Sequence, residues 1–210
     1  MRIVFDFAGV LFHWQPPRLL QRVLPHHAGD AQDAAALAET IFQGYGGDWA
    51  EFDRGRLEVP ELVRRIAART GLPVQDVRAV VDAVPKELQP MADTVSLLRR
   101  LRDAGRRLFY LSNMPLPYAE HLERAHDFVG WFEAGVISAR VQQIKPEREI
   151  FDIAARRFHA DPSQLVFIDD VLANVHAARQ AGWQALHFVN AADCELQLRR
   201  GGWLSATGSC

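Results

Sequence analysis

The chain has 210 residues, a length that allows one large domain or a core domain with a small satellite. Apolar residues make up 49% and charged residues 24%, the balance of an ordinary globular protein, which excludes a disordered chain, a fibre and a coiled coil. The net charge of -2 supplies no overall attraction for nucleic acid, and no window approaches the ~18 consecutive apolar residues of a membrane span.

The first predicted element is a strand at residues 3–7. It is a continuous apolar run broken only by one aspartate, as expected of a strand covered on both faces. Residues 13–85 contain no convincing strand. Their apolar residues recur at helical spacing instead, for example at Leu62, Ile66 and Ala67. We therefore expect a helical segment directly after the first strand.

A regular alternation of helices and strands follows. Helices are predicted around residues 95–101, 118–127, 147–159 and 173–181, and strands at residues 108–111, 135–138, 165–168 and 184–188. Strands that alternate with helices imply a parallel sheet with right-handed crossovers. The predicted fold class is therefore α/β, a doubly wound, Rossmann-like parallel sheet with a small helical cap domain inserted after the first strand.

The predicted domain organisation follows from this order of elements. Residues 1–12 and 86–200 form the α/β core, residues 13–85 the helical cap, and residues 201–210 a loosely ordered tail. In an open parallel sheet, ligands bind beyond the C-terminal ends of the strands. An insertion that leaves the sheet from that edge is expected to lie over the site like a lid.

Cysteine usage and the N-terminal residues both favour a cytoplasmic protein. The chain has only two cysteines, Cys194 and Cys210, too few for a disulfide framework, and neither lies in a spacing that binds zinc, so a reducing compartment is expected. The apolar run at residues 3–5 is too short for a signal peptide, and Asp6 interrupts it.

Polar residues cluster at the C-terminal ends of the predicted strands. They are far apart in the sequence, but the fold brings them to one rim. They are Asp6 after the first strand, Ser112 and Asn113 after the second, Lys145 after the third, and Asp169 and Asp170 after the fourth. This convergence is the strongest functional signal in the sequence.

The chemistry of these residues points to a metal-assisted reaction. Carboxylates at close range raise one another's pKa and oppose folding, and a divalent cation removes the problem. Oxygen ligands without a nearby His or Cys cluster favour magnesium over zinc. Lys145 adds a positive charge, Ser112 a hydroxyl and the Asn113 region backbone N–H groups, which together could hold a phosphoryl group. Asp6 would then be the nucleophile that forms an aspartyl-phosphate.

With these residues the chain resembles the haloacid dehalogenase (HAD) superfamily. The resemblance is carried by four motifs in order, at residues 4–10, 111–113, 145–147 and 167–170. It covers essentially the whole chain, and the family's small cap is placed where the helical insertion is predicted here. The resemblance implies a hydrolase of phosphoric monoesters with Mg2+ as its cofactor.

The resemblance also implies a role for each matching residue. Asp6 and Lys145 match catalytic residues, and Asn174 falls where many members have a second acid near the metal. The implied magnesium ligands are Asp6, the backbone carbonyl of Ala8, Asp169 and Asp170. The implied phosphate-binding residues are Ser112, Asn113 and Lys145.

One position departs from the family's phosphatase pattern. Most phosphatases of the family carry an aspartate two residues after the nucleophile, as general acid and base, and here that position is Ala8. Such help is typically worth ~10²–10⁴-fold in rate. His13, a few residues downstream, is one candidate substitute. The departure leaves two alternatives open: an L-2-haloacid dehalogenase, in which Asp6 attacks carbon, and a catalytically weak or inactive binding protein.

The expected partner is a small phosphorylated molecule. Residues 49–58 resemble a cap segment of bacterial sugar-phosphate phosphatases, such as those of glucose 1-phosphate, so a sugar phosphate is the expected substrate. Nucleic acid and membranes are not expected as partners. The chain is expected to be a monomer or a homodimer.

Overall fold

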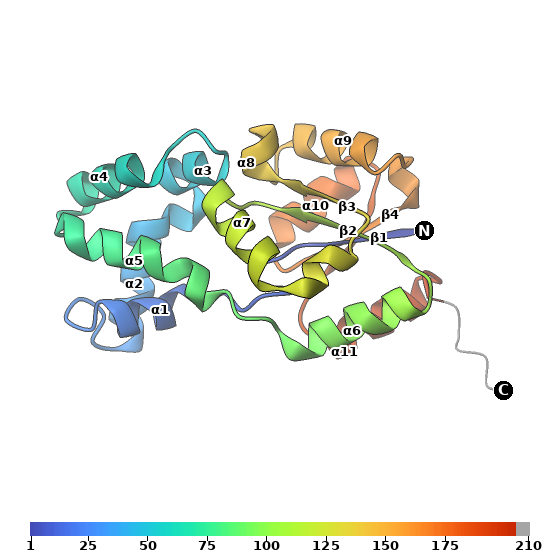
Figure 1. Cartoon of the computed structure of the whole chain (residues 1–210), viewed down its shortest axis with the longest axis horizontal. Helices are drawn as coiled ribbons and strands as arrows, with labels where there is room; N and C mark the ends of the chain where they lie inside the picture. Colours follow the sequence, from blue (N-terminus) through green and yellow to red (C-terminus); the bar gives the residue numbers. More distant parts are fainter. Residues whose placement is uncertain (205–210) are drawn as a thin grey trace.

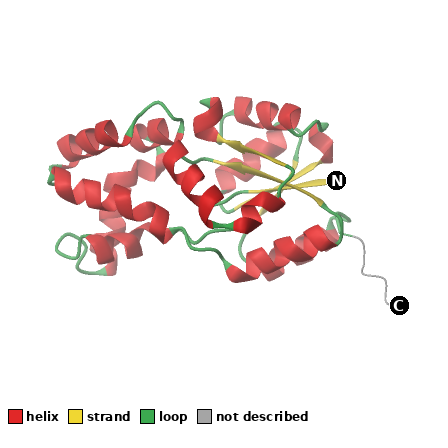
Figure 2. Ribbon diagram, viewed as in Figure 1, coloured by secondary structure: helices red, strands yellow, loops and turns green. Residues whose placement is uncertain are grey.

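The computed structural model describes residues 1–204, with the side chain of Tyr45 excepted. A sheet with helices on both faces forms one part of the molecule, and an all-helical part lies beside it (Figures 1 and 2). The predicted α/β fold class is confirmed. Residues 205–210, which belong to the predicted tail, lie outside the described residues.

Five parallel strands form one sheet in the order β3-β2-β1-β4-β5. Their bounds are β1 (Arg2–Phe5), β2 (Arg107–Ser112), β3 (Ala134–Ile137), β4 (Leu165–Asp169) and β5 (Gln184–His187). Every predicted strand is present. The first ends at Phe5, two residues earlier than expected, so Asp6 lies just beyond its C-terminal end.

Both faces of the sheet are covered, and the side chains of β1 alternate between them. Ile3 and Phe5 join one buried cluster, and Val4 joins another. The first cluster includes residues of α6 (Ala92–Asp103), α7 (Leu116–Ala125) and α11 (Ala191–Arg200). The second includes residues of α9 (Arg148–Arg157) and α10 (Leu172–Gln180), whereas the short α8 (Ser138–Val141) follows β3 directly. This double cover explains why the strand is apolar at consecutive positions.

Helix α11 was not predicted. Its first turn is capped by Asn190, whose side chain accepts a hydrogen bond from the Asp193 N–H at 2.9 Å. Cys194 and Leu198 are fully buried against the core. The helix packs beside α6 along the lower edge of the molecule in Figure 1. It therefore completes the cover of one face of the sheet.

The helical insertion, residues 16–87, consists of five α-helices. They are α1 (Pro16–Val23), α2 (Ala31–Phe42), α3 (Gly47–Asp53), α4 (Val59–Thr70) and α5 (Val74–Glu87). Figure 1 shows that the strands run towards this insertion, so it faces their C-terminal ends. None of the helices described in the chain is long and apolar enough to cross a membrane.

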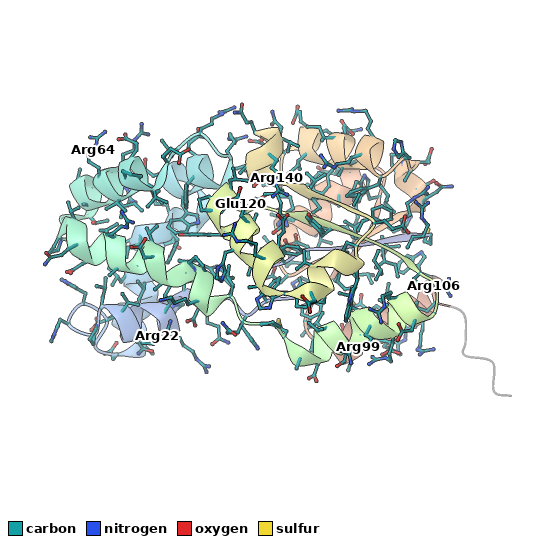
Figure 3. All side chains as sticks on the ribbon, viewed as in Figure 1. Arg22, Arg64, Arg99, Arg106, Glu120 and Arg140 are labelled. Atoms are coloured by element: carbon teal, nitrogen blue, oxygen red, sulfur yellow. The ribbon has the colours of Figure 1, made fainter. Side chains whose placement is uncertain are left out.

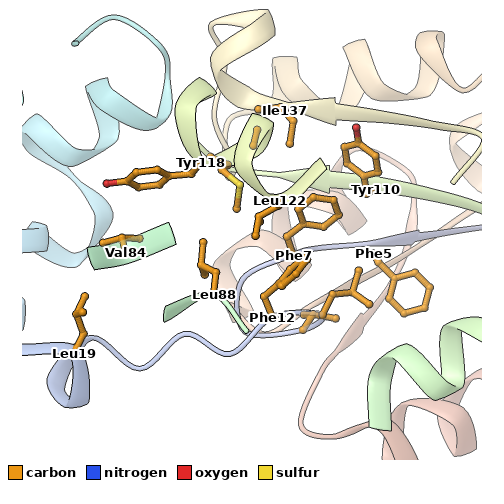
Figure 4. Packing of buried hydrophobic residues seen from close by; sticks show 14 of the residues in the cluster. Phe5, Phe7, Phe12, Leu19, Val84, Leu88, Tyr110, Tyr118, Leu122 and Ile137 are labelled. Carbon is orange, nitrogen blue, oxygen red and sulfur yellow. The ribbon is translucent and has the colours of Figure 1, made fainter. Parts of the chain in front are cut away.

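Aromatic and aliphatic side chains connect the insertion with the sheet domain. Ring contacts run from Phe42 to Trp49, Phe52 and Tyr118, the last of which belongs to α7. Figure 4 shows Tyr118 beside Val84 of α5, in the region between the two parts. Charged side chains project outward from the ribbon in Figure 3. The ring contacts thus form a continuous apolar connection between the two parts.

Candidate active site

Three acidic side chains meet at the C-terminal edge of the sheet. Asp6 follows β1, Asp169 is the last residue of β4, the neighbour of β1 in the sheet, and Asp170 follows it. Each offers a carboxylate oxygen, and these oxygens lie within 4.8 Å of one another. The predicted convergence of these residues is therefore present in the structure.

A glycine makes this approach possible. Gly9 has a φ of +83°, a conformation that favours glycine, and it lies in the turn after Asp6. A Cβ atom at this position would lie 2.2 Å from Oδ2 of Asp170. The turn can therefore pass against the Asp170 carboxylate only because residue 9 has no side chain.

Lys145 lies between two of the acids. Its Nζ atom is 2.9 Å from Oδ2 of Asp6 and 2.7 Å from Oδ2 of Asp169, and its side chain is only 1% exposed. Burial alone would lower the pKa of Lys145, but Asp169 and Asp6 raise it above its ordinary value. One ammonium thus faces three carboxylates, and negative charge is in excess.

Burial, together with the neighbouring carboxylates, shifts the pKa values of the acids. The pKa of Asp6 is raised to about 8, first by burial and then by Asp169 and Asp170, against the lowering effect of Lys145. The pKa of Asp170 is also raised, by burial and then by Asp169. A divalent cation among these oxygens would favour the ionised forms. The donor set is composed of oxygen atoms, which fits magnesium.

Asp169 is held by more hydrogen bonds than its two acidic neighbours. Besides Lys145, the side-chain amide of Asn174 donates to its two oxygens, both at 3.1 Å, and the Val171 N–H donates at 2.8 Å. Asn174, noted at the position of a second acid, thus binds an acid of the cluster. Asp6 and Asp170 keep more of their oxygen valence available for a metal or a substrate.

Ser112 and Asn113, the expected phosphate-binding residues after the second predicted strand, differ in their hydrogen bonds. Asn113 lies at the cavity, but its side chain is engaged with the backbone of Lys145: its amide donates to the Lys145 carbonyl at 2.9 Å and its oxygen accepts from the Lys145 N–H at 2.7 Å. Ser112 is fully buried, and its hydroxyl has no hydrogen-bond partner within residues 1–204. The structure thus shows Asn113 positioning Lys145.

A cavity of about 250 Å³ lies between the acids and the helical insertion. Asp6, Ala8, Lys145 and Asp170 line it on the sheet side. The other walls are mostly apolar. They come from α3, α5, α7 and the segments before α1, after α5 and before α7, through Trp14, Trp49, Val84, Leu88, Met114 and Tyr118. A bound molecule would therefore meet charged groups at the ends of the strands and mainly apolar side chains in the rest of the cavity.

One acidic residue of the cavity was missed by the sequence analysis. Asp53, at the end of α3, is 7% exposed and lines the cavity together with Asp6 and Ala8. Its spacing of four residues from Trp49 places both on one face of the helix, which was the available signal. His13, the candidate substitute for the missing acid, is exposed and does not line this cavity.

Comparison with known proteins identifies the family. Residues 1–182 match the haloacid dehalogenase-like hydrolase family. A sesquiterpene phosphatase of Aspergillus oryzae is 27% identical over 197 residues, which cover 94% of both chains. The D-ribitol-5-phosphate phosphatase of Bacteroides thetaiotaomicron is 32% identical over 208 residues, with 93% of this chain and 95% of the relative covered.

Solved structures show the same fold. A HAD family enzyme from Bacteroides thetaiotaomicron, in complex with magnesium and inorganic phosphate, matches with a TM-score of 0.69 and 22% identity, over 88% of this chain and 92% of its own. The L-2-haloacid dehalogenase of Xanthobacter autotrophicus, with chloropropionic acid covalently bound, matches with a TM-score of 0.66 and 17% identity, over 95% and 82%. These similarities establish the shared architecture.

Proposed function

Because the chain belongs to the haloacid dehalogenase-like hydrolases, we propose that it is a magnesium-dependent phosphatase in which Asp6 attacks phosphorus. One observation carries the proposal: the carboxylates of Asp6, Asp169 and Asp170 gather at one edge of the sheet, beside a buried lysine and at the end of a cavity. The two phosphatases that resemble the chain over nearly its whole length support this reading.

The proposed reaction has two steps. An oxygen of Asp6 forms a bond to phosphorus while the ester P–O bond breaks, which gives an aspartyl-phosphate and an alcohol that takes up one proton. Water then attacks the aspartyl-phosphate, loses a proton and releases inorganic phosphate, and Asp6 is restored. Lys145 holds Asp6 at 2.9 Å and offers positive charge to the phosphoryl oxygens during both steps.

Magnesium would be held by Asp6, Asp170 and the carbonyl of Ala8, with Asp169 as a further ligand or as the group that orients Lys145. Within residues 1–204, no hydrogen bond ends on the carbonyl oxygen of Ala8, which leaves it available. When bound, the ion supplies positive charge against the phosphoryl oxygens and against the acidic cluster.

The walls of the cavity bear on the substrate. A sugar phosphate was the expectation from the sequence, and the two phosphatase relatives carry names that refer to substrates of opposite polarity, a sesquiterpene and ribitol 5-phosphate. Burying several hydroxyl groups without partners would cost ~1–3 kcal/mol each. Since Trp49, Leu88 and Met114 offer mainly apolar surface to the substrate, we propose a phosphate ester with a substantial apolar part.

Phosphate release from a panel of esters tests this function. The panel contains 4-nitrophenyl phosphate, decyl phosphate, farnesyl phosphate, glucose 1-phosphate and ribitol 5-phosphate, each with Mg2+ and with EDTA. We expect hydrolysis that requires Mg2+, with the apolar aliphatic esters preferred over the sugar phosphates. Asp6→Asn should reduce turnover by at least ~10⁴-fold because the nucleophile is lost.

Two results would contradict the proposal. Turnover that persists in Asp6→Asn would remove Asp6 as the nucleophile. Chloride release from L-2-chloropropionate, unaffected by EDTA and without any release of phosphate from the panel, would favour the dehalogenase alternative. An exposed acid on another element, Asp82→Asn in α5, serves as a matched control that should keep full activity.

A further inference from the structure

The proposed phosphatase reaction requires a proton donor that the expected position does not supply. Residue 8 lines the cavity but carries only a methyl group. An aliphatic alcohol is a poor leaving group unless a proton reaches its oxygen as the P–O bond breaks, and the water of the second step must lose a proton. The group that does both must lie at the cavity, near Asp6.

Asp53 places a carboxyl group at the cavity, and within residues 1–204 no structural contact engages that group. Its side chain is more than nine-tenths buried and lines the cavity that Asp6 and Lys145 also line. No hydrogen bond or ion pair of its carboxyl group is found among the described residues of the chain. Its oxygens are not among the fully buried side-chain atoms that lack a partner, so they face the space of the cavity, where a substrate or water can reach them.

The backbone around Asp53 is fixed against the sheet domain at two points. The Ser138 hydroxyl, in α8, donates to the Asp53 carbonyl at 2.5 Å. The next residue, Arg54, makes a two-pronged contact with Glu147, with both N–O distances at 2.7 Å. Glu147 follows Lys145 by two residues, so the end of α3 is tied to the segment that carries the catalytic lysine.

Close packing reinforces this attachment. A Cβ atom at Gly55, which has a φ of +77°, would lie 2.7 Å from the carbonyl oxygen of Ala139. The chain after α3 therefore lies directly on α8. Because both sides of Asp53 are held, its carboxyl group has a defined place relative to Asp6.

We propose that Asp53 is the catalytic acid and base of this phosphatase, in the role that the family usually gives to the position occupied here by Ala8. The inference rests on the proposed function. In the first step the Asp53 O–H proton passes to the ester oxygen as its bond to phosphorus breaks, and the alcohol leaves neutral. In the second step the Asp53 carboxylate takes a proton from the attacking water, which restores the starting state.

The electrostatic surroundings support the protonated state that the first step needs. The pKa of Asp53 is raised to about 8, first by burial and then by Asp6, against the lowering effect of Lys145. Tyr118, from α7, is the other titratable group that faces Asp53, and its hydroxyl is engaged with the Val81 carbonyl at 2.8 Å. An unpaired carboxyl group in this setting keeps its proton near neutral pH.

The test compares esters whose leaving groups differ in their need for a proton. In Asp53→Asn, the first turnover of 4-nitrophenyl phosphate should stay as fast as in the wild type, since 4-nitrophenolate leaves without protonation. A slow steady state should follow because water is no longer deprotonated. With the aliphatic ester of the panel that the wild type hydrolyses fastest, the first turnover should fall by ~10²–10⁴-fold.

Matched variants and a fold measurement separate chemistry from structure. Asp48→Asn changes an acid of the same helix that is paired with Arg69 and does not line the cavity, and it should keep both rates. The circular dichroism spectrum of Asp53→Asn should match that of the wild type, and its thermal midpoint should be no lower. Adding Ala8→Asp to Asp53→Asn should raise the turnover of the aliphatic ester at least tenfold above that of Asp53→Asn alone.

Three outcomes would overturn the inference. They are an unchanged turnover of the aliphatic ester in Asp53→Asn, an equal loss of the first turnover with both kinds of ester, and a wild type that hydrolyses 4-nitrophenyl phosphate but none of the aliphatic esters. The failure of the proposed function looks different, because then the wild type releases no phosphate from any ester in the panel.

Discussion

The two sides of the cavity differ in how their polar groups are held. On the sheet side, Lys145 contacts Asp6 and Asp169, and Asp169 is bonded in turn by Asn174. On the insertion side, the walls are aromatic and aliphatic, and Asp53 has no partner for its carboxyl group within residues 1–204. The hydrogen-bonded charged groups of the sheet side thus face an apolar wall in which Asp53 is the one acid without a partner among residues 1–204.

The two sides of the cavity suit different parts of the reaction. A network of charged groups fixes positions and stabilises charge, and it suits a part of the substrate that never changes, such as a phosphoryl group. An apolar wall selects the remainder of the substrate by burial of its surface. An isolated acid within that wall is free to exchange a proton, since no hydrogen bond holds it in one state.

Removal of the lysine is expected to have the largest effect on the sheet side. Lys145→Met leaves two buried carboxylates without their cation, so the free energy of unfolding in EDTA at pH 7 should fall by ~3–5 kcal/mol, and phosphatase activity should be lost. Urea unfolding followed by circular dichroism measures the change.

The control is the other lysine of the chain, Lys86, which is exposed in α5. Lys86→Met should alter the free energy of unfolding by less than ~0.5 kcal/mol. An equal loss in the free energy of unfolding of the two variants would mean that the buried ion pairs of Lys145 do not stabilise the sheet side. The sheet side would then not differ from the insertion side in how its polar groups are held.

A smaller effect of opposite sign is expected on the insertion side. In the folded protein Asp53 keeps its proton up to about pH 8, whereas the unfolded chain loses it near pH 3.8. Between these values the unfolded state binds fewer protons, so this group lowers the stability of the metal-free protein as pH rises. Asparagine cannot ionise, so Asp53→Asn should be more stable than the wild type at pH 8, by at least about 2 kcal/mol.

The pH dependence distinguishes this effect from a general change in packing. The advantage of Asp53→Asn should shrink as the pH falls from 8 and vanish below pH 3.8, where Asp53 is protonated in both states. Urea midpoints at pH 4, 6 and 8 measure it, with Asp48→Asn as the variant that should gain nothing. A constant difference at all three pH values would mean that ionisation of Asp53 does not oppose folding.

The sequence predicted the sheet side well because that side follows from strand order. Asp6 follows β1, Lys145 follows β3 and the short α8, and Asp169 ends β4. Parallel strands bring such positions to one edge. The engagement of the Asn113 side chain with Lys145 could not be predicted, since it depends on the path of a loop. Helix α11 was missed although Asn190 and the apolar spacing after it indicated a helix.

The insertion side could be predicted only as a set of helices. Whether Trp49 and Asp53 face a cavity or solvent depends on how α3 packs on α8, and no local pattern determines that packing. His13 was considered for the opposite reason, its closeness to Asp6 in the sequence, but it is exposed. Distance along the chain was a poor guide to the acid because the insertion brings a distant residue to the site.

The smallest effect is expected where the sequence had suggested the largest. If Asp53 already transfers the protons, Ala8→Asp in the wild type should change the turnover of an aliphatic ester by less than about threefold, since general acid–base help of this kind is gained only once. In the Asp53→Asn background the same substitution should raise turnover at least tenfold. The four proteins of this cycle are compared by kcat for the aliphatic ester that the wild type hydrolyses fastest. Additive effects on kcat would mean that the two residues act independently, and a strong interaction would mean that they serve the same proton transfer. A rise of a hundredfold in Ala8→Asp alone would show that the wild type lacks a proton donor, and the isolated acid of the apolar wall would then have no part in the chemistry.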